Sequence, residues 1–455
     1  ERGDNVKPVS IIAVVMTAAV AVAVTTEAQP LTLEEAARLA LTSHPSIDAA
    51  SAGAREAAAG VQVARAGFLP RLAWSGSYTR SNNPVYAFGT LLTQQRFAED
   101  NFAIDRLNNP AAVQNFQSVL SIEQTVFDAN RTKHAVRAAR VQEEMSAEDR
   151  RARELDVLMG VATTYFGVVV SAERTRVAAQ AVTSADADLR RAQAMFDSGQ
   201  TTNADVLAVQ VHRASAVQER IRAVNDFEVA RAALNDALGI GLDELREPVT
   251  PLRAALPPTD TLEAYVSLAA GLRPDARQAV LGVDLAAEQT GQARTALWPT
   301  VVVQGIVEAD GARFADQGGR NWLAGVAMHW ELWKGAENRA RVTAATYGEE
   351  EADAGRRQVQ SATALHVRQA WFAFRSAHER LDVAQTTVAQ AEEGLRIVRN
   401  RYESGLEAVT ELLRSETALI HARYGRLAAL FEQRTARAAL EYAGGRLMAS
   451  SEVMQ

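Results

Sequence analysis

Two long stretches of the chain carry apolar or small residues at alternating steps of three and four positions, the spacing of one face of a helix that packs against other helices. The clearer seam runs through Val367, Ala370, Phe374, Ala377, Leu381, Ala384, Val388, Ala391, Leu395, Val398 and Tyr402. A weaker one runs through Ala178, Val182, Ala185, Leu189, Ala192 and Phe196. A helix over 131–196 would be roughly 100 Å long at about 1.5 Å per residue. We therefore predict two long helical hairpins, at 131–238 and 336–443, which no compact globular domain can hold.

Shorter segments alternate apolar and polar residues at every second position, the pattern of a half-exposed strand. Trp322, Val326 and Trp330 lie on one side of such a segment, opposite Gly325 and His329. We predict four strands, at about 70–80, 117–127, 299–309 and 321–333. About ten residues is the length that a tilted membrane-spanning strand requires, although a hairpin of a soluble protein can have the same length.

The chain is built from two similar halves. Thr32-Leu33-Glu34 recurs 229 positions later as Thr261-Leu262-Glu263, whereas Ser198-Gly199 recurs only 206 positions later as Ser404-Gly405. The spacing falls by 23 between about Tyr78 and Ser121, so the first half carries an insertion between its two strands.

Each half begins with an alanine-rich helical stretch, at 32–67 or 261–296, that ends before a proline. These leading helices and the returning helices of the hairpins are each about 36 residues, so one of each, placed end to end, matches one long helix. We divide the chain into a signal at 1–28, a first repeat at 29–239, a linker at 240–258, a second repeat at 259–445 and a tail at 446–455.

The N-terminus has the features of an export signal. Arg2 and Lys7 precede an uncharged run from Val9 to Val24, which is followed by the small-x-small pattern Thr26-Glu27-Ala28. A membrane-anchoring helix is the alternative, but the run is about 16 residues and a spanning helix needs about 20. No later stretch is apolar for long enough, so any further span must consist of strands. Four strands cannot close a barrel, and copies of the chain would have to associate to pair the open edges.

Composition and motifs argue against several other functions. The 455 residues include no cysteine, which rules out disulfides and thiolate metal sites. A net charge of −7 makes binding to nucleic-acid phosphates a poor hypothesis. The seven histidines are dispersed without an HExxH pair, and neither GxxxxGK nor GxGxxG occurs. We therefore expect no cofactor, no metal and no enzymatic activity.

Several short motifs, in the same order in both halves, resemble those of the TolC-like outer-membrane efflux proteins. They are the opening LTLEEAARLAL, the strand entry Phe68-Leu69-Pro70, the strand exits VFDANR and LWKGAENRARV, and the turns FDSG and RYESG. The resemblance implies a mainly α protein with a β-barrel portion: a homotrimer in which a 12-stranded β-barrel in outer-membrane lipid continues as a 12-helix α-barrel in the periplasm. It also implies a passive channel of a tripartite efflux or type I secretion system. Its partners would be a periplasmic membrane-fusion adaptor and an inner-membrane transporter of the RND, ABC or MFS type.

The resemblance assigns roles to residues at the helical turns. A polar link that closes the periplasmic mouth is implied for Asp205 and Tyr402, and a lumen-narrowing carboxylate for Glu411. Glu407 stands where some relatives carry a basic linking residue, and Arg414 where a second acid is expected, so Glu407 would repel Asp205 unless Arg401 or Arg414 compensates. The adaptor would dock at the turns, whose residues are Phe196, Ser198, Gly199, Ser404 and Gly405.

Simpler explanations stay open for each of these groups. The charged residues also fit a solvated helix face, and Phe196 and Tyr402 fit the last positions of the seams. The aromatic residues Trp74, Tyr78, Trp322, Trp330 and Trp333 fit the interfacial girdles of a barrel, or else a buried sheet face. For the whole chain the alternative is a soluble periplasmic coiled-coil scaffold or adaptor, which would explain the seams but not the repeated strand pairs.

Overall fold

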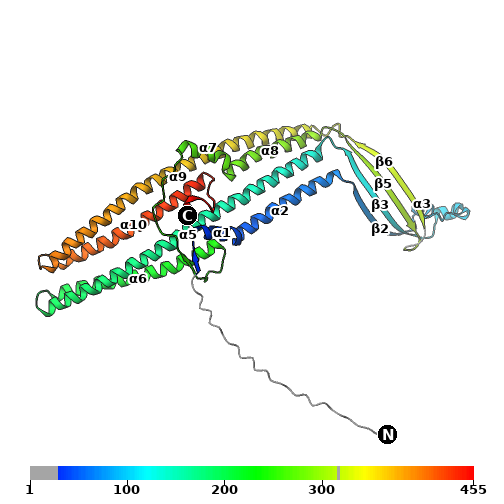
Figure 1. The fold of residues 1–455 in the computed structure, drawn as a ribbon. Coiled ribbons are helices and arrows are strands. Elements are labelled where there is room, and N and C mark those ends of the chain that lie inside the picture. The colour runs from blue at the N-terminus through cyan, green and yellow to red at the C-terminus, as the bar shows by residue number, and fades with distance from the viewer. Residues whose placement is uncertain (1–28, 315–317, 455) are drawn as a thin grey trace, which may run out of the picture.

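The computed structural model describes residues 29–314 and 318–454, and it is an elongated molecule with a sheet at one end of a long helical body (Figure 1). The predicted signal at 1–28 lies outside the described residues. Two helices of 67 residues, α5 (Arg131–Asp197) and α9 (Glu337–Glu403), run along the body. α6 (Asn203–Leu238) and α10 (Val409–Ala443) return beside them. The two predicted helical hairpins are thus present, at nearly the predicted bounds.

The leading helices are not continuous, and the prediction of one helix at 32–67 and one at 261–296 is wrong. The first stretch forms α1 (Leu33–Ser43), α2 (Pro45–Arg65) and the short η1 (Ala66–Phe68). The second forms α7 (Leu262–Leu272) and α8 (Pro274–Thr295). Each break lies before a proline, whose ring disfavours the helical conformation at the preceding residue. His44 and Arg273 are accordingly extended, with ψ of 125° and 132°.

The C-terminal ends of the returning helices pack against the leading stretches at these breaks. α6 ends at Gly239, which has a φ of +71°, and a Cβ there would lie 2.6 Å from the Cα of His44. The Ser43 hydroxyl donates to the Leu238 carbonyl at 2.6 Å. In the second half, Gly445 lies in the same way against Arg273. The returning helices therefore meet α2 and α8 end to end. These two helices have 21 and 22 residues, so the predicted pairing of two 36-residue helices is wrong.

The sheet is antiparallel, in the order β2-β3-β5-β6, and its strands are β2 (Arg71–Ser81), β3 (Val113–Phe127), β5 (Thr300–Gly311) and β6 (Gly319–His329). β3 begins at Val113 rather than at 117, because its first residues pair with the end of β2. β6 ends at His329 rather than at 333, because His329 pairs with Thr300, the first residue of β5. Residues from Trp330 on have no strand partner there, and the strand stops.

The insertion between β2 and β3 forms short helices. It contains α3 (Pro84–Thr93), the short η2 (Glu99–Phe102) and α4 (Ile104–Asn108), and it extends from the far end of the sheet (Figure 1). The Asn83 side chain caps α3 by accepting from the N–H groups of Val85 and Tyr86. At the other end of α3, Gln94 donates to the carbonyl of Gln114 and so attaches the insertion to β3.

The largest apolar core lies in the middle of the body. Tyr165 and Phe166 of α5 pack there against α1, the end of α6 and the C-terminal segment, whose η3 (Glu452–Met454) buries Met454. The Tyr165 hydroxyl donates to the Leu31 carbonyl at 2.7 Å, in the short strand β1 (Gln29–Leu31), and β1 pairs in parallel with β4 (Arg246–Pro248) of the linker. The linker therefore packs against the middle of the helical body.

The prediction that no later stretch is apolar for long enough to span a membrane is wrong for α5. Among the described residues, α5 contains an 18-residue window that is apolar enough to cross a membrane by length and composition. Half of that window is buried inside the protein. The stretch supplies the central core, and its apolar composition has a sufficient cause in that packing.

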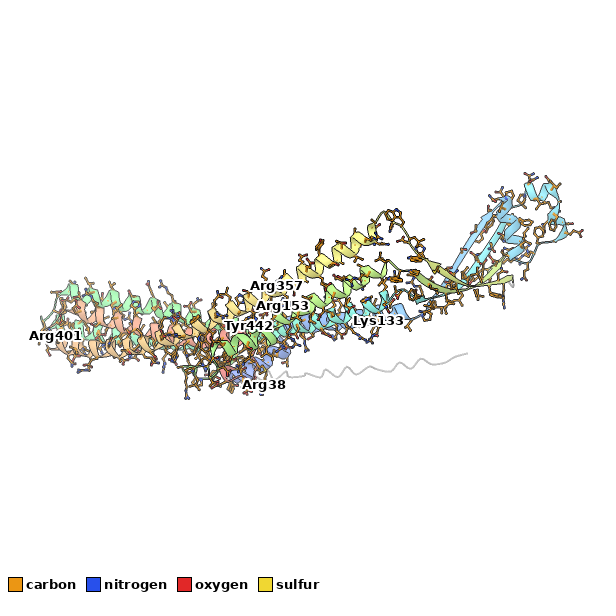
Figure 2. All side chains as sticks on the ribbon, turned by 90° about the horizontal axis from the view of Figure 1, so that it is seen from above. Arg38, Lys133, Arg153, Arg357, Arg401 and Tyr442 are labelled. Atoms are coloured by element: carbon orange, nitrogen blue, oxygen red, sulfur yellow. The ribbon has the colours of Figure 1, made fainter. Side chains whose placement is uncertain are left out.

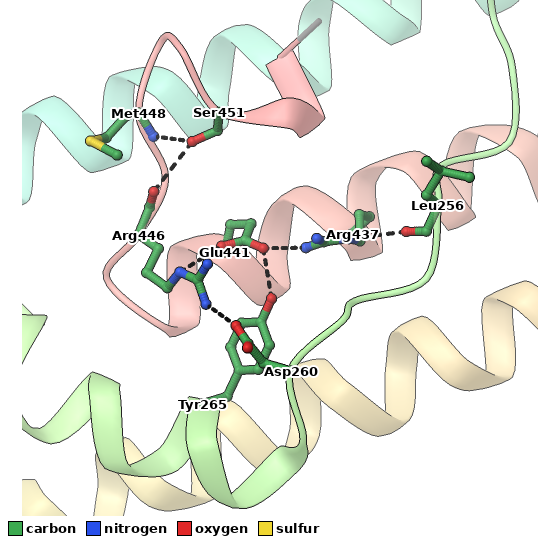
Figure 3. Close-up of polar contacts among 8 residues, drawn as sticks. All are labelled: Leu256, Asp260, Tyr265, Arg437, Glu441, Arg446, Met448 and Ser451. Carbon is green, nitrogen blue, oxygen red and sulfur yellow. Dashed lines mark hydrogen bonds and ion pairs between the residues drawn. The ribbon is translucent and has the colours of Figure 1, made fainter.

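A buried polar network fastens the second half at the same level (Figure 3). Glu441 of α10 pairs with Arg437 at 2.5 Å and accepts from the Tyr265 hydroxyl of α7 at 2.7 Å. Arg437 also donates to the Leu256 carbonyl of the linker, and Arg446 bridges Glu441 and Asp260. One acidic side chain thereby joins α10, α7, the linker and the C-terminal segment.

Candidate functional site

The two faces of the sheet differ sharply in chemistry. The strand register places on one face Leu72, Trp74, Tyr78, Phe116, Leu120, Ile122, Val301, Val303, Val307, Trp322, Val326 and Met328. Most of these side chains are exposed, with Trp322 at 80% and Val326 at 72%. So continuous an apolar surface is typical of a membrane or protein contact. No other segment of the described residues covers this surface.

The opposite face is polar. It carries Ser75, Ser77, Thr79, Asn115, Gln117, Ser121, Glu123, Gln304, Glu308, Asp310 and Asn321. Gln117 donates to Glu308 at 2.9 Å across β3 and β5, and Asn115 donates to Asp310 at 2.5 Å. The separation is not complete, because Val119, Val302, Ile306 and Leu323 also lie on this face. A sheet with one mainly apolar and one mainly polar face is suited to separate lipid from water.

The five predicted interface aromatics fall into two groups. Trp74, Tyr78 and Trp322 lie within strands on the apolar face, and the register places Trp74 and Trp322 in one row with Leu120 and Val307. Trp330 and Trp333 follow β6, where the sheet meets the helices, and the Trp330 indole donates to the Leu297 carbonyl at 3.2 Å. All five are exposed, which argues against the buried sheet face. The prediction missed Trp298, an exposed residue just before β5.

The turns of the two hairpins lie at the end of the body farthest from the sheet, where Figure 2 places Arg401. Both have the same backbone. Gly199 and Gly405 each have a φ of +73°, and their N–H groups donate to the carbonyls of Phe196 and Tyr402. Glycine adopts this left-handed conformation without steric cost, so the Ser-Gly pairs have a structural reason. Phe196 is 40% exposed and Tyr402 only 5%, so only Tyr402 is a seam residue.

Asp205 is engaged within its own helix. Its carboxylate accepts from the Thr201 hydroxyl at 2.7 Å and from the backbone and hydroxyl of Thr202, which makes a capping box at the start of α6. These hydrogen bonds hold the pKa of the Asp205 carboxyl below its ordinary value. Burial, and then the negative charges of Asp205 and Asp188, raise the pKa of the Tyr402 phenol. Among the described residues no hydrogen bond joins Asp205 to Tyr402, so the polar link between them stays a prediction.

The remaining predicted gate residues pair within the chain. Glu407 pairs with Arg401 at 3.1 Å, one of the two compensating partners expected for it. Glu411 and Arg414 pair with each other at 2.6 Å across one helical turn. The arginines are exposed and the glutamates are partly exposed, so each pair contributes little to stability.

Sequence reasoning missed a buried charged cluster a short distance above the turns. Asp188 of α5 and Glu416 of α10 are 6% and 4% exposed. Glu416 accepts from Arg399 of α9 at 2.5 Å and lies 3.4 Å from the His212 imidazole of α6. The signal was present, because Glu416 stands between the buried Leu412 and Leu419 at seam spacing. At Asp188, the first-half seam was assigned to the neighbouring Leu189.

No metal site accompanies these groups: in the part of the chain that the structure describes, no three acidic, histidine or cysteine side chains come together as ligands. The candidate site consists of three structural features. Its parts are an amphipathic sheet, a pair of helical turns and a charged cluster between the hairpins.

Comparison with known proteins covers almost the whole chain. The family model described as "Outer membrane efflux protein" matches residues 36–240 and 265–446. The pyoverdine export outer membrane protein OpmQ of Pseudomonas aeruginosa is 25% identical over 405 residues, which are 86% of this chain and 80% of that protein. The alkaline protease secretion protein AprF of the same species is 24% identical over 432 residues, covering 92% of this chain and 85% of AprF.

The fold has counterparts among solved structures. The CmeC outer membrane channel of Campylobacter jejuni superposes with a TM-score of 0.78 at 19% identity, covering 92% of this chain and 87% of CmeC. Such a likeness concerns the backbone and assigns no residue a role.

Proposed function

Because this chain belongs to the outer membrane efflux protein family, we propose that three copies of it assemble into one channel, which crosses the outer membrane as a β-barrel and continues into the periplasm as a helical tunnel. The observation that carries the proposal is the sheet with two chemically different faces and two open edges, β2 and β6. Three copies of the four-stranded sheet give 12 strands, and β6 of one copy then pairs with β2 of the next. Closing the barrel in this way gives hydrogen-bond partners to the backbone amides of both edge strands, and lipid offers none.

The polar face would line the lumen and the apolar face would contact lipid. Each copy would contribute four helical segments of similar length to the tunnel. Two of them are the long helices α5 and α9, and the other two are the end-to-end pairs of shorter helices. Three copies then give the 12-helix tunnel. This role needs no catalytic group, because the channel would conduct passively. The driving force would come from an inner-membrane transporter of the RND, ABC or MFS type.

A periplasmic adaptor would dock at the helical turns, around Phe196, Ser198, Gly199, Ser404 and Gly405. The exposed Phe196 supports this assignment, because an aromatic ring at the tip is available to a partner. Asp205, Tyr402, Glu407, Glu411 and Arg414 would form the resting mouth. The names of OpmQ and AprF refer to the export of pyoverdine and to the secretion of an alkaline protease. The cargo of this chain would be set by its transporter.

A matched pair of substitutions on β6 tests the orientation of the sheet. Val326 and Ala327 are neighbours and both are exposed, but their side chains lie on the apolar and the polar face. An arginine on the lipid side of a barrel costs about 2–4 kcal/mol at the membrane midplane. We expect Val326→Arg to reduce the amount of trimer in outer-membrane fractions strongly, and Ala327→Arg to leave it near the wild-type amount.

The mass of the detergent-solubilised wild type, with low-resolution imaging, measures the assembly itself. A trimer with a tunnel supports the proposal. A water-soluble single chain, or equal tolerance of arginine at both positions, would refute it and would favour the soluble scaffold.

A further inference from the structure

The charged cluster between the hairpins contains two buried carboxyl groups, and the Nη1 atom of Arg191 and the Nε atom of Arg399 beside them are buried without a hydrogen-bond acceptor among the described residues. Asp188 reaches Glu416 across the boundary between the α5–α6 hairpin and the α9–α10 hairpin, and each carboxyl influences the titration of the other. The Oδ2 atom of Asp188 is buried and accepts no hydrogen bond from any described residue. An ionised carboxylate in that position would leave a buried anion unsatisfied, which is costly.

The charges around the pair are fully accounted for. On α5, Arg191 lies 4.0 Å from Asp188 and pairs with Glu403 of α9 at 2.7 Å. Arg399 of α9 is committed to Glu416. With Asp188 neutral, two anions, Glu403 and Glu416, face two arginines. With Asp188 ionised, three anions face the same two cations.

The remaining titratable neighbours do not correct this imbalance. His212 of α6 lies against Glu416 rather than Asp188, and the Tyr402 phenol of α9 is neutral until its raised pKa is reached. While His212 is neutral, the balanced state of the cluster is therefore the one in which Asp188 carries a proton and can donate it to Glu416.

We propose that Asp188 and Glu416 share one proton and form a pH-sensitive latch that holds the two hairpins together at the periplasmic end of the channel. Loss of that proton places two carboxylates side by side between the hairpins, and their repulsion is relieved only when α5 and α10 separate. The inference rests on the proposed function, because separation of the hairpins has a consequence only if their tips form the mouth of a channel.

The direction of the response follows from the pKa values. Burial, and then the neighbouring Glu416, raises the pKa of the Asp188 carboxyl to about 7. Burial acts to raise the Glu416 pKa as well, but hydrogen bonds with His212, Asp188 and Arg399 outweigh it and lower that pKa. Since the packed tip binds the Asp188 proton more tightly than a separated tip would, packing is favoured at acidic pH and weakens as the pH rises through about 7.

The pair is also accessible to protons. A pocket of about 260 Å³ borders Glu416, though not Asp188, and is lined by His212, Leu395, Arg399, Glu416, Leu419 and Arg423. Water in that pocket would connect the cluster to the solvent without unfolding of the helices.

Single-channel recording of the full-length trimer in planar lipid bilayers tests the latch, with the pH varied on the side of the helical end. We expect the ratio of open to closed time in the wild type to rise between pH 5 and 7, by up to about tenfold per pH unit for each proton released. Asp188→Asn keeps a donor for Glu416 but cannot ionise, so it should stay in the low-conductance state at every pH.

The matched control is Asp186→Asn. Asp186 lies one half-turn away on α5 and pairs with Arg213 of α6 at 2.5 Å, within a single hairpin. This variant loses the same charge and should retain the wild-type pH response. A pH response that survives in Asp188→Asn would overturn the latch, as would its loss in both variants.

Amide hydrogen exchange of the wild-type trimer gives a second measurement that needs no variant. Protection of residues 186–210 and 395–420, corrected for intrinsic rates, should fall as the pH rises from 5 to 8. A trimeric, conducting protein with flat conductance and flat protection refutes the latch alone. A protein that forms neither a trimer nor a channel refutes the proposed function instead.

Discussion

Replacement of Arg437 should strongly lower the free energy of unfolding, because this residue holds together the polar network in the middle of the helical body. Its guanidinium is 7% exposed, pairs with the equally buried Glu441, and donates to the Leu256 carbonyl at 3.2 Å (Figure 3). Removing one partner of a buried ion pair costs about 3–5 kcal/mol, because the other charge is left without compensation. In Arg437→Leu, Glu441 would keep Arg446 at 3.5 Å and the Tyr265 hydroxyl, so the lower end of that range applies. We expect a loss of about 3 kcal/mol per protomer.

Guanidinium unfolding of the detergent-solubilised protein, followed by far-ultraviolet circular dichroism at one fixed protomer concentration, measures this loss. The control is Arg357→Leu on α9, whose 68% exposed side chain pairs with Asp353 at 3.6 Å and should contribute less than about 0.5 kcal/mol. The double variant Arg437→Leu/Glu441→Leu removes both charges and should be less destabilised than Arg437→Leu. Equal effects of Arg437→Leu and Arg357→Leu would refute the reasoning, because burial would then make no difference.

Two further predictions concern alkaline stability and the end-to-end contacts of the helices. Burial raises the pKa of both Tyr265 and Tyr442 to about 12, and hydrogen bonds to Glu441 and Asp156 respectively add to this effect. The pKa of a tyrosine in the unfolded chain is about 10. The contribution of the two phenols to stability is therefore complete below about pH 10 and is lost as the pH rises through about 12. The free energy of unfolding should therefore fall over that interval, and an unchanged slope in Tyr265→Phe/Tyr442→Phe would contradict the assignment. Gly239→Ala should destabilise the protein more than Gly405→Ala. Both glycines have a φ above +70°, a conformation that costs alanine about 1–2 kcal/mol. Only at Gly239 would the added Cβ also meet backbone, at 2.6 Å from the Cα of His44. Equal losses in the two unfolding experiments would show that the contact with His44 does not constrain the site.

The sequence by itself determined the repeated parts of this protein. A seam of small and apolar residues at steps of three and four specifies a helix whatever surrounds it, and Val367, Ala377 and Leu381 are buried as their spacing requires. The alternation around Trp322 and Val326 likewise determined the two faces of the sheet, because a strand has a period of two. The Ser-Gly turns needed no tertiary context, since glycine at a positive φ ends a helix by local sterics.

Other features depended on contacts between distant segments. The bounds of β3 and β6 follow from which partner residues remain, and no local pattern contains that information. The break at His44 is a local effect of Pro45, but the three-dimensional fold alone shows that Gly239 packs into it. The cluster of Asp188, Glu416 and Arg399 is the strongest case, because each charge is ordinary on its own helix. Only the packing of four helices removes them from water together, and the desolvation of two carboxyls at one contact is what gives that contact its sensitivity to pH.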